Sequence, residues 1–162
     1  MSDLSGLSLA DLSRVLSTAL ADGRDGAVAE LAIEREALAR SGGAAVQHYV
    51  LRDGAPATAS PEDYVAWRKS VGWPCRIAAS EAGLSFVSTE FVGVDLGPIA
   101  ETGGAGAPLV FQTVVCSEDQ DLDGLVWLAA TREAAETRHG AVVAAIEAGH
   151  EAVAELLESD AA

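Results

Sequence analysis

Polar side chains interrupt the stretch that holds most of the bulky strand-forming residues, positions 83–130. Strand alternation would place Ser88 and Glu90 on one face, with Gln112 in the next expected strand. If these strands pair, Glu90 and Gln112 meet across the ladder, where a carboxylate can bind a ligand or act as a base. The alternative is a wet sheet face on which both side chains contact water. The candidate ligand-binding residues are Ser88, Glu90, Asp95 and Gln112.

A second candidate site is the acidic turn that follows the Gln112 strand. Asp119, Asp121, Asp123 and Gly124 match the first half of a calcium-binding loop. The twelfth position of such a loop carries a bidentate glutamate, and here it is Ala130. The pattern therefore predicts weak calcium binding at most, and the alternative is a solvated turn with Asp-Gly geometry. We expect no other cofactor.

Two histidines form the third candidate. His139 and His150 lie about three turns apart on one expected helix, so they would share a face. Such a pair can bind a metal or sense pH, but no third ligand can be placed beside it. Both positions also border the apolar stripe of the helix, and packing is the alternative interpretation.

The remaining signals do not favour an enzyme. The connector of residues 97–106 is rich in glycine, but no GK[ST] sequence follows it and the next expected element is a strand. The sequence also has no nucleophile elbow, paired-cysteine metal site or Rossmann fingerprint.

The order of elements predicts an α+β fold. It consists of an antiparallel β-meander of four to five strands with helices packed on one face, preceded by an N-terminal helical hairpin. We expect the hairpin to be an extension over residues 1–44 and residues 45–162 to form a single domain with a long C-terminal helix, which Gly149 weakens or breaks. The expected strands are 46–52, 76–80, 84–95, 108–116 and 125–130. The expected helices are 8–22, 27–40, one that starts at Pro61 and one that follows Thr131.

Charge and hydropathy exclude several classes of partner. The net charge of −15 argues against nucleic acid and against anionic lipid surfaces. No apolar run approaches the roughly 18 residues of a membrane span. The first residues lack the basic region of a signal peptide, so we expect a cytoplasmic protein. In that compartment Cys75 and Cys116 are expected to be free thiols.

Between His48 and about Val143 the chain resembles a family of small uncharacterised proteins found in bacterial genomes and their phages. The segments that carry the resemblance are HYVLRDGAP, DYVAW, CRIAASEAGLSFVSTEFVGVDLG, PLVFQTVV and TREAAETRHG. The family has an apolar residue at the position of Glu90, a histidine at that of Leu96 and a glutamate at that of Gln112. This chain keeps only Asp95 of these three polar positions. The resemblance thus implies no inherited Asp-His-Glu site here.

Taken together, the sequence favours a non-enzymatic protein-binding or assembly module, phage- or prophage-associated, acting through a protein partner or self-association. The alternative is a small-ligand-binding protein that uses the sheet face around Glu90 and Gln112. An enzyme is the least favoured of the three classes.

Overall fold

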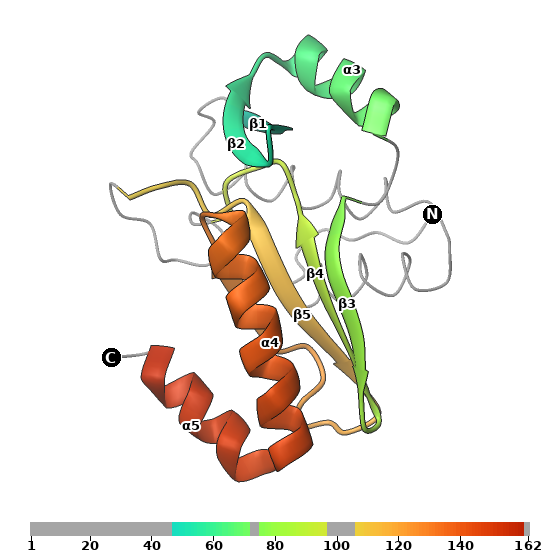
Figure 1. Cartoon of the computed structure of the whole chain (residues 1–162), viewed down its shortest axis with the longest axis vertical. Coiled ribbons are helices and arrows are strands. Elements are labelled where there is room, and N and C mark those ends of the chain that lie inside the picture. The colour runs from blue at the N-terminus through green and yellow to red at the C-terminus, as the bar shows by residue number, and fades with distance from the viewer. Residues whose placement is uncertain (1–46, 72–74, 97–105, 161–162) are drawn as a thin grey trace.

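The computed structural model describes residues 47–71, 75–96 and 106–160 (Figure 1). The helical hairpin expected over residues 1–44 lies outside the described residues. Within them the chain has the predicted α+β class, with antiparallel sheets and three helices.

The centre of the fold is a four-stranded antiparallel meander. Its strands follow one another in chain order, and they are β3 (Arg76–Ala82), β4 (Ser85–Phe91), β5 (Phe111–Ser117) and β6 (Val126–Ala129). Gly83, with φ of 60°, makes the tight β3–β4 turn. The expected strand over residues 84–95 ends early, at Phe91, because the chain bends at Gly93 with φ of 81°.

The first two strands form a separate sheet. β1 (His48–Arg52) and β2 (Ala55–Ala59) pair as a hairpin through Asp53 and Gly54, which both have positive φ. The meander therefore has four strands, within the predicted four to five, and the strand expected over residues 46–52 lies outside it; β2 was not predicted. The Asp53-Gly54 turn folds the chain back on itself, so β1 pairs locally with the alanine- and proline-containing β2. A single bridge, His48 to Val94, joins this hairpin to the main sheet region.

Helix α3 (Pro61–Val71) begins as predicted, with Ser60 Oγ accepting a hydrogen bond from the Asp63 amide at 3.1 Å. It lies against the hairpin at one end of the sheet (Figure 1), so the expectation that it packs along a sheet face is wrong. Its Trp67 ring contacts the Phe91 ring edge-on, with centroids 5.6 Å apart. Aromatic contacts between α3 and the end of β4 thus fix the position of the helix.

The long C-terminal helix is divided in two. α4 (Arg132–Ala148) starts at the predicted cap, where Thr131 Oγ1 accepts from the Ala134 amide at 3.1 Å. It ends at Gly149, with φ of 113°, and α5 (His150–Asp160) then turns away and packs on α4 (Figure 1). The predicted break at Gly149 is confirmed.

α4 covers one face of the four-stranded sheet, called here the inner face; the opposite face is the outer face. Two apolar clusters lie on the inner side. The first consists of Val87, Val115, Leu122, Trp127, Val142, Ala145 and Val153. The second consists of Phe91, Val110, Phe111 and Ala135, with Tyr49, Trp67 and Ile77 among the residues packed against it.

Two further sequence predictions can be compared with the structure. Cys75 and Cys116, both half-buried, are not joined in a disulfide bond. Among the described residues, no helix has the length and apolar character needed to cross a membrane.

Candidate functional site

The outer face carries the pair that the sequence singled out. Glu90 and Gln112 are direct partners in the β4–β5 ladder, and Gln112 Nε2 donates to Glu90 Oε2 at 2.9 Å. Ser88 Oγ donates to the other carboxylate oxygen, Oε1, at 2.6 Å. Only 2% of Glu90 and 0% of Gln112 is exposed, so the interpretation of a wet sheet face is wrong. The carboxylate is instead buried and held by two side-chain donors.

Arg76 lies on the same outer face, opposite Glu90 in the β3–β4 register. Its guanidinium carbon is 5.6 Å from the centre of the Phe86 ring, within the range of a cation–π contact. Its Nε and Nη2 atoms are buried, and within the described part of the chain neither has a hydrogen-bond partner. No pattern in the sequence indicates this burial, since arginine at the start of an edge strand is ordinarily solvated.

Asp95 is separate from this network. Its Oδ1 accepts from the Leu109 amide at 2.9 Å, and Leu96 donates its amide to the Leu109 carbonyl at 2.8 Å. Asp95 therefore joins the two chain segments on either side of the connector. Burial, and then the charge of Asp95, raise the pKa of the Tyr49 phenol above its usual value. Of the four predicted ligand-binding residues, the structure brings together Ser88, Glu90 and Gln112.

The inner face holds a polar network that was not predicted from the sequence. His139 Nε2 lies 2.9 Å from Ser80 Oγ, and its Nδ1 lies 3.0 Å from Thr89 Oγ1. Thr89 Oγ1 is also 2.7 Å from the hydroxyl of Thr113. Only 7% of His139 is exposed, and burial lowers the pKa of its imidazole. These four side chains form a polar layer between the two apolar clusters.

The distance between Ser80 and His139 is one at which an imidazole can activate a nucleophile. In serine hydrolases, however, a carboxylate orients the histidine and stabilises its charged form. Here the neutral hydroxyl of Thr89 has that place, and burial favours the uncharged imidazole. The arrangement supports packing and helix position better than nucleophilic catalysis.

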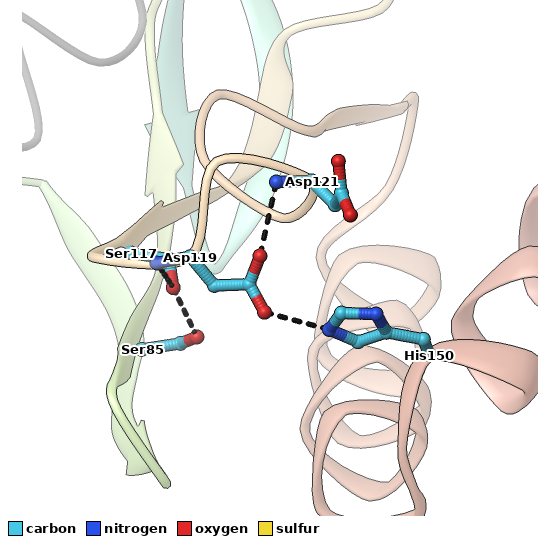
Figure 2. A network of polar contacts seen from close by, with 5 residues as sticks. All are labelled: Ser85, Ser117, Asp119, Asp121 and His150. Carbon is cyan, nitrogen blue, oxygen red and sulfur yellow. Dashed lines mark hydrogen bonds and ion pairs between the residues drawn. The ribbon is translucent and has the colours of Figure 1, made fainter.

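The acidic turn is built from hydrogen bonds to its own backbone (Figure 2). Asp119 Oδ1 accepts from the Asp121 amide at 3.0 Å, and Asp123 Oδ1 accepts from the Ser117 amide at 3.1 Å. Gly124 has φ of 82°, as a turn glycine does. Across the described ranges, no group of three or more His, Cys, Asp or Glu side chains is arranged to hold a metal ion. The structure therefore does not bring Asp119, Asp121 and Asp123 together as a ligand set.

The same turn is tied to α5. His150 Nε2 lies 2.6 Å from Asp119 Oδ2, and both side chains face solvent in part (Figure 2). The Asp121 amide, followed by His150, holds the pKa of the Asp119 carboxyl below its ordinary value. The prediction that His139 and His150 share one helix face is wrong, because Gly149 separates them into two helices.

Comparisons with family models, curated proteins and solved structures found no match to this chain. The function of the protein is therefore inferred from the geometry of its side chains.

Proposed function

We propose that this protein is a non-enzymatic assembly module that associates with further copies of itself through helices α3 and α5. One observation carries the proposal. These two helices lie at opposite ends of the described part of the molecule (Figure 1), and each exposes at least one large apolar side chain; the last turn of α3 is basic, whereas the last turn of α5 contains no basic residue.

At the α3 end the exposed apolar residues are Val65 and Val71, with 49% and 52% of each accessible. Lys69 is exposed between them in sequence, in the basic last turn of the helix. Tyr64 of the same helix is buried. The last turn of α3 therefore combines exposed apolar surface with positive charge, whereas the exposed Glu62 and Asp63 of its first turn are negative.

At the α5 end the exposed apolar residue is Leu157, 39% accessible. Glu155 and Glu158 are exposed elsewhere on the same helix, and the last turn contains no basic residue. Val153, one turn before Leu157 on the same side of the helix, is buried in the first apolar cluster. This end therefore combines apolar surface with negative charge.

The two ends complement each other in charge as well as in apolar surface. Apolar contact supplies affinity, and paired charges select the register and exclude wrong partners. Because the two surfaces differ and lie at opposite ends, contact between them is heterologous and adds copies head to tail. A net charge of −15 opposes such association at long range, so the contact is favoured at physiological salt, where screening acts beyond about 8 Å.

The test is sedimentation velocity over a range of protein concentrations. We expect the wild type to form species larger than a monomer as concentration rises, and Val71→Asp to shift the distribution towards monomer. Val71 is exposed, so the variant should remain folded, which circular dichroism would verify. Ala79→Asp, at an exposed position of β3 away from both helices, is the matched control. A wild-type protein that stays monomeric at all concentrations would contradict the proposal.

A second function, small-ligand binding, is favoured by the outer face. Glu90 and Gln112 are buried there, and the half-buried Arg76 on the same face has two buried donor atoms that lack a partner within the described residues. If this face binds a small ligand, adding that ligand should change the side-chain amide signal of Gln112 in nuclear magnetic resonance spectra. No response to any solute tested would count against it.

Cytoplasmic location and association with phages or prophages also belong to this proposal. The association with phages or prophages is supported by the sequence resemblance to the bacterial and phage family. The identity of neighbouring genes and co-purification from the native host would test them.

A further inference from the structure

We infer that the Arg76 guanidinium on the outer face is a binding site for the carboxylate of a small monocarboxylate ligand. The inference rests on the second function proposed above and names its ligand class. It is independent of the self-association of α3 and α5.

Two nitrogen atoms of the half-buried Arg76 guanidinium are buried without an acceptor. Nε and Nη2 are both removed from solvent, and neither finds a partner among the described residues. A buried charged donor without an acceptor is costly, and native structures rarely tolerate it without a ligand or a functional reason. Two such donors on one side chain point to an oxyanion that binds both.

The two donors also have the geometry of a carboxylate site. Nε and Nη2 lie on the same edge of the planar guanidinium, and that edge donates two parallel hydrogen bonds to a carboxylate. The Phe86 ring, 5.6 Å from the guanidinium carbon, restrains the plane of the group from one side. The donor pair is thus oriented before a ligand arrives, which reduces the entropy lost on binding.

The neighbouring charge selects the class of anion. Glu90 is the ladder partner of Arg76, and its two oxygens are engaged by Ser88 and Gln112. Its negative charge nearby, in a chain of net charge −15, disfavours multivalent anions such as phosphate. A single carboxylate satisfies both donors with the least repulsion.

A cavity beside Phe86 offers space for the rest of the ligand. Phe86 also lines a shallow, open cavity of about 510 Å³ at the β3–β4 turn, which Arg76 does not line; its other walls include Leu84, Cys116 and the acidic Glu81, Glu118 and Asp123. This volume falls within the range of small-molecule sites. The non-ionic part of a monocarboxylate can therefore lie along the Phe86 ring towards this cavity.

The experiment is a titration of the full chain with sodium acetate, followed through the Nε–H signal of Arg76 and the side-chain amide of Gln112. Acetamide, which has the same shape without the charge, is the matched ligand control. We expect acetate to shift the Arg76 signal saturably and acetamide to leave it unchanged. Arg76→Lys keeps the charge but loses the paired donors, and should weaken acetate binding by about tenfold or more. Arg132→Lys, at an exposed arginine paired with Glu136, should bind acetate as the wild type does.

Other results would overturn the inference. If acetate shifts Gln112 but not Arg76, the outer face binds a ligand and the role of Arg76 is wrong. If neither signal responds to acetate or acetamide, this inference fails together with the small-ligand function. If Glu90→Gln alone shifts the Arg76 signal and acetate does not, Arg76 pairs with Glu90 in solution, and the carboxylate site is excluded.

Discussion

Thr89 is the branch point of the buried polar layer. Its single hydroxyl is shared by Thr113 and His139, at 2.7 and 3.0 Å, and none of its surface is exposed. The layer lies where α4 passes from one apolar cluster to the other, between Ala135 and Val142. A polar layer in this position fixes how the helix is placed along the sheet, since any shift would leave buried hydroxyls without partners.

We predict that Thr89→Val will destabilise the protein by about 1–3 kcal/mol. The substitution preserves shape and removes the one atom that both neighbours bond, so the loss is polar rather than a cavity effect. Urea denaturation followed by circular dichroism measures it. Thr137→Val, the same change at an exposed position of α4, should cost less than about 0.5 kcal/mol. Equal effects of the two changes would show that the layer contributes no stability.

His139 makes the layer sensitive to pH. Burial lowers the pKa of its imidazole below the ordinary 6.5, so the unfolded chain takes up this proton at a higher pH than the folded protein does. The stability that neutral His139 contributes is thus present above pH 6.5 and is lost as the pH falls below it.

We predict how the Tm of the wild type and that of His139→Gln differ between about pH 8 and about pH 5.5. At about pH 8 the variant should be less stable than the wild type. The difference should shrink as the pH falls, because only the wild type then has to protonate a buried imidazole or unfold. Carboxylates titrate in both proteins and cancel in the difference. A constant difference in Tm across the range would contradict the assignment.

The contrast between the two sheet faces shows what sequence could predict at this scale. Alternation along one strand correctly separated Ser88 and Glu90 from Thr89, and pairing of adjacent strands brought Glu90 to Gln112. Burial of that pair was not predictable, since alternation does not reveal what covers a face. The contact of His139 with Ser80 and Thr89 depends on how α4 crosses the sheet, which no local pattern contains.

At the scale of elements, local signals located the ends well. Ser60 and Thr131 cap their helices as predicted, and Gly149 divides the C-terminal helix. The differences from prediction concern which strands pair with one another. The strand expected over residues 46–52 is observed as β1, His48–Arg52, and the Asp53-Gly54 turn gives it β2 as a partner instead of the meander. Pairing depends on which neighbour is nearest in space, and propensity alone does not decide it.

Gly149 is the element boundary with the clearest backbone requirement. Its φ of 113° and ψ of 177° lie in a region that side-chain-bearing residues essentially do not enter. Nothing lies within 4 Å of a Cβ built there, so backbone strain is the whole effect of a substitution. We predict that Gly149→Ala will destabilise the protein by about 1–3 kcal/mol.

Gly140 provides a matched control inside α4. A Cβ at this position also meets open space, but the backbone is helical. Gly140→Ala should therefore stabilise the protein by about 0.5–1 kcal/mol, since alanine is the better helix former. Thermal unfolding of both variants measures the opposite signs. Stabilisation by Gly149→Ala would mean that α4 and α5 join as one helix in solution and that the observed break is not required by the fold.

At the scale of the whole molecule, the two ends of the described fold carry different exposed side chains. The end at α3 carries exposed valines and Lys69, and the end at α5 carries exposed Leu157 with Glu155 and Glu158. If copies associate through these ends, the charges that meet come from different helices of different copies. Association can therefore be tested with charge-reversal variants, in which one reversal should restore the association that the other weakens.

Lys69→Glu alone would set glutamate against glutamate at every contact, and Glu155→Lys with Glu158→Lys would set lysine against lysine. Each variant should associate roughly five- to tenfold more weakly than the wild type, because surface attraction becomes repulsion. In an equal mixture of the two, however, copies that alternate meet only opposite charges, and association should return. A single chain carrying all three changes should also associate, since its two reversed ends carry opposite charges.

Sedimentation velocity of the separate, mixed and combined variants distinguishes head-to-tail association from an isologous dimer through α3 or α5. In such a dimer like helices meet, so the combined variant would gain nothing over the better of its parents.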